Sequence, residues 1–399
     1  MSNLQGKRIL LGITGSIAAY KAAELASQLT QAGALVDAIL TPAAEKFVTP
    51  LTFQSVTGRH AYTEADLWGG EAHVLHVGLG HSAHLLVVAP CTANTIAKLV
   101  HGQADNLLTI TALAARCPTL IAPAMDGGML DHPATQENLG KLAQRGAFIA
   151  GPAEGHLASG LLGKGRMLEP TDLIGHIRRI LGREGRLAGR KLVVSAGGTQ
   201  EPLDPVRVLT NRSSGKQGYA IAQAAIDLGA DVVLVSASTA LKAPIGARLV
   251  PAGTAEEMLD AVRQASAGAD ALIMAAAVAD FRPKKAAADK MKSREGVPHL
   301  DLEATDDVLK AVANGTRPKV VVGFAAESRD LAQNAAEKLR SKKLDLIVAN
   351  DITASDAGFG TDTNRVTLID AGGRSETLPL ASKAEVAEII VERVAALLE

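Results

Sequence analysis

The sequence predicts an α/β protein with two three-layer domains, each built around a mostly parallel sheet. The chain has 399 residues, whereas a single hydrophobic core rarely grows beyond about 250 residues. Short apolar runs alternate with amphipathic stretches along the chain, a pattern typical of βαβ units with a buried parallel sheet. The pattern starts again near residue 190, where an apolar run leads into a second glycine-rich turn. These observations favour two Rossmann-like halves.

The expected elements follow from the apolar runs. In the first half, a helix over 20–29 follows the first strand and a helix over 173–181 closes the domain. A charged stretch interrupted by glycines follows, so the expected domains are 1–181 and 190–399, with a linker at 182–189. The expected strands are 8–11, 35–40, 85–89 and 119–122 in the first half, then 192–195, 232–236, 271–276, 320–324 and 346–349 in the second.

Composition excludes several classes of protein. Lysine and arginine number 41 against 42 acidic residues, and aromatic residues make up 3% of the chain, so a basic or base-stacking nucleic-acid surface is not expected. Two cysteines cannot form a disulfide framework. The polar N-terminus contains no signal-peptide core, and the longest apolar run, 271–279, is far too short to span a membrane. We therefore expect a cytoplasmic protein without nucleic-acid or membrane partners.

The first expected strand leads into the glycine turn Gly12-Ile13-Thr14-Gly15-Ser16-Ile17 and then into a helix. This arrangement binds phosphate, because free backbone N–H groups and the positive end of the helix dipole face the ligand. The spacing is not GxGxxG, and the second strand ends at Thr41 instead of at an acidic residue that would bind an adenosine ribose. The turn therefore favours a mononucleotide such as FMN over NAD. A turn that only packs the helix against the strand is the alternative.

Four histidines, His73, His76, His81 and His84, lie close together in the sequence. Zinc is the first ligand to consider, but helical spacing would not direct all four imidazoles at one point, and the only nearby carboxylate is Glu71. One imidazole beside a flavin would act as a base or an electrostatic partner near neutral pH. An ordinary surface or core role stays open for each histidine.

Three motifs of the first half resemble, in order and spacing, those of the flavin-dependent cysteine decarboxylases. They are His76-Val77-Gly78-Leu79, Pro90-Cys91-Thr92-Ala93-Asn94-Thr95 and Pro123-Ala124-Met125-Asp126-Gly127-Gly128-Met129. Residues 160–167 resemble the loop that covers substrate in the phosphopantothenoylcysteine branch of this family. The resemblance implies a catalytic His76, substrate contacts at Met125 and Asp126, and FMN contacts at Gly12, Thr14, Gly15, Ser16, Ile17, Thr41, Thr92, Ala93, Asn94 and Thr95.

Two positions depart from the family pattern. Asp126 stands where the family has Asn, and an ionised carboxylate would repel a substrate carboxylate. Ser159 stands where the family has the Cys that donates a proton when the reduced flavin returns its hydride, and an alcohol is a far weaker acid than a thiol of pKa about 8.5. The proton would then pass through ordered water at Ser159, a protonated Asp126, His156 or Cys91. For Cys91, the alternative role is that of a small buried apolar side chain.

The second half contains a different phosphate motif. Ser213-Ser214-Gly215-Lys216 precedes an expected helix and supplies backbone donors, hydroxyls and a cation, which suit a polyphosphate. It is not a P-loop, because Gln217 follows the lysine. A capped helix with a solvated lysine is the alternative. Ligands of open parallel sheets bind beyond the carboxyl ends of the strands, which here carry Asp280, residues 324–327 and Asn350-Asp351, with lysines at 290, 292, 338, 342 and 343 nearby.

This half resembles phosphopantothenate-cysteine ligase domains, with the motifs 196–207, 211–218, 276–280, 323–327 and 349–351 in order. With the first half, the chain resembles the family of bifunctional enzymes of coenzyme A biosynthesis. The resemblance implies that CTP and 4'-phosphopantothenate form an acyl-cytidylate with Mg2+, and that L-cysteine displaces CMP. The residues implied are Asn211 and Arg207 for phosphopantothenate and the acyl-cytidylate, Ser213, Ser214 and Gly215 for a phosphate, and Ala276, Asp280, Lys290, Phe324, Lys338 and Lys342 for the nucleotide.

The same resemblance implies the second reaction and the assembly. FMN would oxidise 4'-phosphopantothenoylcysteine, CO2 would leave, and the enethiol would be reduced to 4'-phosphopantetheine. Flavin domains of the family form trimers and ligase domains form dimers, which implies a homo-oligomer such as a dodecamer. Metal ligands are not identified. Two alternatives are a two-domain NAD(P) oxidoreductase, which would need an acidic residue after the second strand, and a non-catalytic regulatory flavoprotein.

Overall fold

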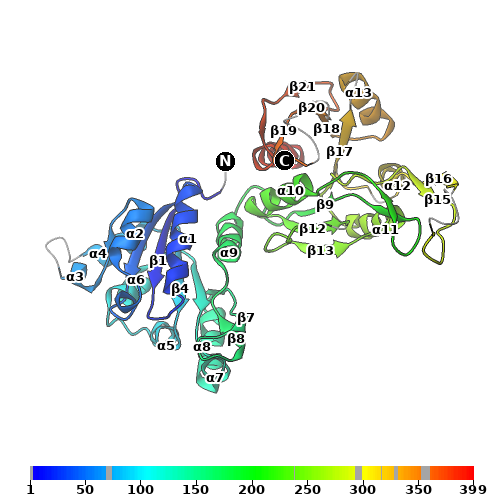
Figure 1. The fold of residues 1–399 in the computed structure, drawn as a ribbon. Helices are drawn as coiled ribbons and strands as arrows, with labels where there is room; N and C mark the ends of the chain where they lie inside the picture. Colours follow the sequence, from blue (N-terminus) through cyan, green and yellow to red (C-terminus); the bar gives the residue numbers. More distant parts are fainter. Residues whose placement is uncertain are drawn as a thin grey trace. The chain divides into compact units, whose positions relative to one another are not determined.

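The computed structural model describes residues 3–68, 74–237, 239–292, 299–315, 317–327, 331–351 and 360–399. The chain divides into two compact units, Ser2–Leu181 and Gly182–Glu399 together with Met1, and each is drawn in Figure 1. Each unit contains a sheet that is wholly or mostly parallel, with helices on both faces. The expected α/β class is confirmed.

The sheet of the first unit has six parallel strands in the order β3-β2-β1-β4-β5-β6. The strands are β1 (Arg8–Ile13), β2 (Leu35–Leu40), β3 (Ala61–Tyr62), β4 (Leu85–Cys91), β5 (Thr119–Pro123) and β6 (Phe148–Ile149). An antiparallel hairpin, β7 (Ala153–His156) and β8 (Leu162–Arg166), lies beside the short helix α7 (Figure 1).

Alternating side chains of this sheet enter two cores. Ile9, Leu11 and Ile13 pack with one set of helices, while Leu10 packs with the other. One face carries α1 (Ala19–Gln31), α2 (Pro50–Thr57) and α9 (Pro170–Gly182), and the opposite face carries α4 (Leu75–Ser82), α5 (Ala93–His101), α6 (Leu107–Ala114) and α8 (Pro133–Gln144). The shorter helices are η1 (Ala44–Lys46), α3 (Glu64–Leu67) and α7 (Gly127–Asp131).

The sheet of the second unit has eight strands in the order β13-β12-β9-β14-β17-β18-β20-β21, and only the β18–β20 and β20–β21 pairs are antiparallel. The strands are β9 (Lys191–Ala196), β12 (Asp231–Ser236), β13 (Arg248–Pro251), β14 (Ala271–Met274), β17 (Val320–Glu327), β18 (Leu346–Asp351), β20 (Val366–Asp370) and β21 (Ser375–Thr377). Two-stranded ribbons join β10 (Gln200–Pro202) with β11 (Val208–Thr210), β15 (Phe281–Pro283) with β16 (Leu302–Ala304), and β19 (Thr363–Asn364) with β22 (Ala381–Ser382).

Helices cover both faces of this second sheet. One core includes side chains of α10 (Lys216–Asp227) and α14 (Lys383–Leu398), and the other includes side chains of α11 (Ala255–Ser266), α12 (Val308–Ala313) and α13 (Leu331–Ser341). The strand expected at 271–276 ends at Met274, because the backbone N–H of Ala276 donates to the side-chain hydroxyl of Ser195 on β9 and not to a backbone carbonyl of that strand. The following loop therefore leaves the sheet at its carboxyl edge.

The segment expected as a linker, 182–189, packs on the second unit. Leu187 is fully buried in its core, and the Leu187 N–H donates to the Leu228 carbonyl at 2.8 Å. A Cβ atom on Gly185 would lie 2.5 Å from that same carbonyl oxygen, so the backbones approach closely. An exposed Leu187 would forfeit about 2 kcal/mol of burial, which explains why the segment is packed.

Candidate active sites

The glycine turn of the first unit borders a cavity of about 610 Å³ at the carboxyl end of β1. Gly15, Ser16 and Ile17 line it from the turn, and Thr92 lines it from the loop after β4. Helix α1 has no side-chain cap and no acidic residue in its first turn, so no carboxylate there offsets the positive end of its dipole. The N–H groups of Ala18 and Ala19 donate to Ser16 within the turn. An anion is therefore favoured here.

Other residues predicted to contact FMN lie beneath this cavity and organise its wall. The Thr14 hydroxyl donates to the Pro90 carbonyl at 2.7 Å and accepts from the Thr92 N–H at 3.1 Å. The Thr41 hydroxyl donates to the Ile13 carbonyl, and a Cβ on Gly12 would lie 2.4 Å from Leu108 Cδ1. These residues, together with Ala93, Asn94 and Thr95, do not line the cavity.

The hairpin β7–β8 supplies the opposite wall. His156 and Ser159 line the cavity from this hairpin, and Met125 and Asp126 line it from the loop after β5. The Met125 N–H donates to the Gly165 carbonyl at 3.0 Å, which ties the hairpin to that loop. The structure therefore brings Asp126 and Ser159 together with the phosphate-type turn, as the sequence resemblance implies.

Ser159 and Asp126 contact each other directly. The Ser159 hydroxyl donates to Asp126 Oδ2 at 2.6 Å, and the Gly128 N–H donates to Asp126 Oδ1 at 3.0 Å. These two donors hold the pKa of the Asp126 carboxyl below its usual range. A protonated Asp126, one of the four proton donors considered above, is thus disfavoured. Burial raises the pKa of the Cys91 thiol, and Cys91 does not line the cavity, so it is disfavoured as well.

His76 lies apart from these residues on α4. It is not among the residues that line the cavity, and its Nδ1 atom is buried without a hydrogen-bond partner in the part of the chain that the structure describes. Of the other histidines, His84 Nδ1 accepts from the Arg8 N–H at 3.1 Å, and His73 lies outside the described residues. Within the described residues no group of three or more His, Cys, Asp or Glu side chains is placed to hold a metal ion.

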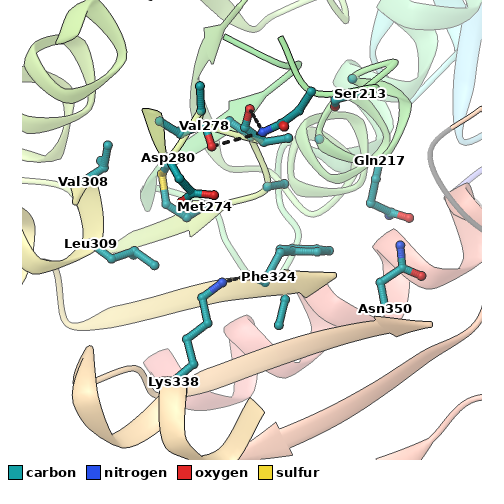
Figure 2. Close-up of a pocket in the computed structure, with 18 of the residues that line it drawn as sticks. Ser213, Gln217, Met274, Val278, Asp280, Val308, Leu309, Phe324, Lys338 and Asn350 are labelled. Carbon is teal, nitrogen blue, oxygen red and sulfur yellow. Dashed lines mark hydrogen bonds between the residues drawn. The ribbon is translucent and has the colours of Figure 1, made fainter. Parts of the chain in front are cut away.

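The second unit contains a cavity of about 670 Å³ at the carboxyl edge of its sheet. Gly215 begins α10 with φ of +74°, and this helix also has no side-chain cap and no acidic residue in its first turn. Figure 2 shows side chains from α10, from the strand ends and from α13 directed into one space. The predicted residues that line it are Asn211, Ser213, Ser214, Gly215, Ala276, Asp280, Phe324, Lys338 and Lys342.

Several of these side chains are oriented by neighbours. Asn211 Nδ2 donates to the Val278 carbonyl at 3.2 Å and to the Ala277 carbonyl at 3.4 Å, which ties the 211–215 loop to the loop after β14. Lys338 Nζ donates to the Phe324 carbonyl at 2.7 Å (Figure 2). Lys342 pairs with Asp307 at 3.0 Å. The cavity thus presents fixed cations and amides.

Two predicted residues do not line this cavity. Arg207 donates to the Met291 carbonyl at 3.0 Å and lies 3.5 Å from Asp204 Oδ2. Lys290 is exposed on the adjoining loop. Two buried polar residues of the 196–207 motif stabilise the loops near the cavity. The Thr199 hydroxyl accepts from the Ala279 N–H, and the Glu201 carboxylate accepts from the Ala255 N–H. Of Asn211 and Arg207, which were both predicted to bind phosphopantothenate and the acyl-cytidylate, only Asn211 lines the cavity.

Several residues that line the second cavity were not predicted from the sequence. The polar run 305–307 was detectable, because Asp307 caps α12 just before an apolar stretch. Gln217, Asn364 and Lys383 carried no such signal, since they come from separate elements and lie up to 166 positions apart along the chain.

Two protein-family models match this chain, and each covers one of its two units. Residues 1–182 match the family model described as Flavoprotein, and residues 187–398 match the DNA/pantothenate metabolism flavoprotein C-terminal domain. The chain is therefore a flavoprotein domain joined to a domain of the pantothenate-metabolism type.

Curated relatives match over the whole length. Coenzyme A biosynthesis bifunctional protein CoaBC of Bacillus subtilis is 44% identical over 99% of this chain and 98% of its own. The CoaBC proteins of Vibrio cholerae and Mycobacterium bovis are 42% and 43% identical, over 98% and 97% of this chain and 98% and 96% of their own lengths. The chain belongs to the CoaBC family of bifunctional coenzyme A biosynthesis proteins.

Two solved structures are similar to one unit each. The C-terminal domain of a CoaBC protein is 40% identical, covering 54% of this chain and 98% of that one, with a TM-score of 0.46. The FMN-dependent cysteine decarboxylase SpaF is 38% identical, covering 40% of this chain and 91% of that one, with a TM-score of 0.36.

Family membership confirms the resemblance and the prediction of a bifunctional coenzyme A biosynthesis enzyme with a flavoprotein domain. The NAD(P) oxidoreductase and the non-catalytic flavoprotein are set aside. None of the described helices is long and apolar enough to cross a bilayer.

Proposed function

We propose that the second unit joins L-cysteine to 4'-phosphopantothenate at the expense of CTP, through an acyl-cytidylate, and that the first unit decarboxylates the product with FMN. The observation that supports this most directly is that each unit has a cavity at the carboxyl edge of its sheet, beside a helix start with no side-chain cap and no acidic residue in its first turn. Each half matches a family model of the corresponding kind.

In the second unit, Asn211 is proposed to hold the reacting acyl group, and Ser213, Ser214 and Gly215 to bind a phosphate at the start of α10. Ala276, Asp280 and Phe324 would contact the nucleoside, while Lys338 and Lys342 would offset phosphate charge. Mg2+ commonly binds through one or two carboxylates and substrate phosphates, and the Asp280 carboxylate, besides contacting the nucleoside, would be available to it in this cavity. Arg207 would contact phosphopantothenate or the acyl-cytidylate, and Lys290 the nucleotide, although neither residue lines the cavity.

In the first unit, Gly15, Ser16 and Thr92 are proposed to bind the FMN phosphate, with Gly12, Thr14, Thr41 and Thr95 shaping the turn. When bound, FMN supplies the transfer of a hydride from and to the substrate. Met125 and Asp126 would position the substrate, and His156 or water held by Ser159 would deliver the proton. Both side chains line the cavity, whereas Cys91 does not.

His76 is proposed to reach the reacting groups of a neighbouring copy in a homo-oligomer. Ile17, Tyr20 and Met129 line the cavity of the first unit, and their side chains are 60%, 62% and 51% exposed. An apolar rim of this kind marks an interaction surface. A second copy seated on the rim would cover these side chains and place another chain's groups at the cavity.

The test uses the purified full chain. We expect a yellow protein whose released chromophore is FMN, and CMP formation from CTP and 4'-phosphopantothenate without cysteine. Added cysteine should then yield 4'-phosphopantetheine and CO2. A colourless protein would overturn the proposal for the first unit. ATP used as readily as CTP, with no CMP formed, would overturn the proposal for the second.

A further inference from the structure

The cavity of the second unit has an end beyond the proposed nucleoside contacts, and of its residues only Lys216 belongs to the phosphate motif described above. In Figure 2, Asp280, Val308 and Leu309 lie on one side of Phe324, and Gln217 and Asn350 lie on the other. The same cavity is lined on that second side by side chains of α10, β18, β19 and α14, which are Lys216, Gln217, Asn350, Asn364 and Lys383. We call these five residues the amide-lysine end.

The charged side chains of the amide-lysine end, within the described residues, are two lysines. Lys383 is only 7% exposed, and Lys383 Nζ donates to the Thr361 carbonyl at 2.5 Å. Burial, and then the nearby Lys216, lower the pKa of Lys383. Lys216 pairs at 2.6 Å with Asp362, which is itself 88% exposed. Asp362 offsets part of this positive charge and raises the pKa of Lys383, and a bound anion would stabilise the buried ammonium of Lys383 further.

The amides of this end are arranged around the lysines. Gln217 Nε2 donates to the Lys383 carbonyl at 3.1 Å, and Asn364 Nδ2 donates to Gln217 Oε1 at 3.3 Å, so Gln217 is fixed in orientation. Asn350 Oδ1 is buried and has no hydrogen-bond partner in the described part of the chain. An unsatisfied buried acceptor costs about 1–3 kcal/mol, so the Asn350 amide has bonding capacity to offer a ligand.

An acceptor beside two cations matches a ligand that carries both an anionic group and an N–H donor. A polyphosphate has acceptors only and would leave the Asn350 oxygen unused. Building on the proposed ligase function, we infer that the amide-lysine end is the subsite for the amino-acid substrate. Its carboxylate lies between Lys216 and Lys383, its amino group points to Asn350, and Phe324 separates it from the nucleoside.

The test compares Lys383→Met with the wild-type chain in steady-state kinetics for each substrate. We expect the KM for cysteine to rise about tenfold or more, the loss usual for a charged hydrogen bond. CMP formation from CTP and 4'-phosphopantothenate without cysteine should stay within about twofold, because that step does not involve the amino acid. Lys383→Arg, which keeps the charge, should recover most of the cysteine affinity.

Lys342→Met is the matched control on the other side of Phe324, and it should raise the KM for CTP without changing the KM for cysteine. If Lys383→Met unfolds, as judged by circular dichroism, Lys216→Met and Asn350→Leu test the same subsite and should raise the KM for cysteine. An unchanged KM for cysteine in the folded variants would overturn the inference, and so would a raised KM for CTP alone, which would assign this end to the polyphosphate. Absence of CMP with the wild-type chain would instead overturn the proposed function.

Discussion

Ser159 donates a 2.6 Å hydrogen bond to Asp126, linking the β7–β8 hairpin to the N-cap residue of α7 at the wall of the cavity of the first unit. The bond directs the Ser159 proton toward a carboxylate, and this donor is the main cause of the lowered pKa of Asp126. Serine and aspartate here replace the cysteine and asparagine implied by the family resemblance, and the structure shows that the two replacements contact each other.

The first prediction concerns this pair. Ser159→Cys introduces a side chain of lower pKa beside the substrate and should accelerate, or at least not slow, formation of 4'-phosphopantetheine. His156→Gln removes an imidazole that lines the cavity and should slow proton delivery by about 10²-fold, so that more of the oxidised enethiol is released. Mass spectrometry separates the two products by the mass of two hydrogen atoms.

The Asp126→Asn variant is the control, because it removes the carboxylate, its amide oxygen accepts from the Gly128 N–H, and its NH2 group donates to the Ser159 hydroxyl after that hydroxyl rotates. It should retain the fold of the hairpin. If the wild-type chain released only the oxidised enethiol, proton delivery by His156 or water would be wrong.

The second prediction separates catalysis from cofactor binding at His76. Because His76 does not line the cavity at the glycine turn, His76→Asn should retain bound FMN and lose CO2 release. Absorbance of the purified variant measures the flavin, and trapped CO2 measures the reaction. A colourless variant would show that His76 has a structural role.

The third prediction concerns Asn211, whose amide bridges to the carbonyls of Ala277 and Val278. Asn211→Asp removes the donor and places a carboxylate against two carbonyl oxygens, so the loop should shift and the acyl-cytidylate should accumulate without completing the reaction. Quenched-flow chromatography follows CMP and the intermediate. Normal turnover by the variant would remove Asn211 from the reacting end.

The sequence predicted the strands and helices well where burial determines them. The run 35–40 coincides with β2 and the run 232–236 lies within β12, because a strand covered on both faces is largely apolar. Asp37 is the buried carboxylate of β2, and it pairs with Arg59 at 2.8 Å. It failed where a local contact competes with the pattern. Strand β14 ends two residues earlier than expected, where the Ala276 N–H donates to the Ser195 hydroxyl. The charged stretch 182–189 packs on the second unit because Leu187 is buried in its core.

The candidate sites were predicted where one motif supplies adjacent residues to one loop, as in 211–215. They were not predicted where the cavity wall combines distant elements, as with Asn364 on β19 and Lys383 on α14. The spacing of residues within one motif does not predict which distant residues lie side by side, because that depends on the order of the strands in the sheet. Some residues of the 196–207 motif are buried and support the cavity wall without lining it. Thr199, for example, accepts from the Ala279 N–H in the loop after β14.

The fourth prediction concerns acid stability. The Asp204 side chain is fully buried and accepts from the N–H groups of Val206 and Arg207, each at 2.8 Å, and of Met291 at 3.2 Å. Burial opposes ionisation, but these three donors outweigh it and lower the pKa of Asp204. The native pKa is below the unfolded value, so the stabilisation is complete above about pH 4 and is lost as pH falls through the native pKa.

Asp204→Asn should therefore lower the Tm of the chain at pH 7, with the difference from wild type shrinking as pH falls below about 4. Asp231→Asn, at an exposed carboxylate, is the control and should leave the Tm nearly unchanged. Thermal melts followed by circular dichroism across this pH range measure both. An equal Tm difference at every pH would show that ionisation of Asp204 does not stabilise the turn.

The last prediction concerns Gly218, which lets α10 approach β9 and so sets the position of the phosphate-binding helix start. A Cβ atom there would lie 2.6 Å from Ala196 Cβ and 2.8 Å from the Ser195 carbonyl oxygen, and neither can move without shifting the backbone. Such overpacking costs about 1–3 kcal/mol, more than the roughly 1 kcal/mol that alanine gains over glycine in a helix.

Gly218→Ala should therefore destabilise the second unit by about 1–2 kcal/mol and raise the KM for CTP, because α10 must move away from the sheet. Gly140→Ala is the matched control: Gly140 lies within α8, is exposed and has open space around it, so this change should stabilise the first unit by up to about 1 kcal/mol. Urea unfolding measures both variants. A Gly218→Ala variant as stable as wild type, with an unchanged KM for CTP, would mean that the helix start tolerates displacement and that its position does not determine phosphate binding.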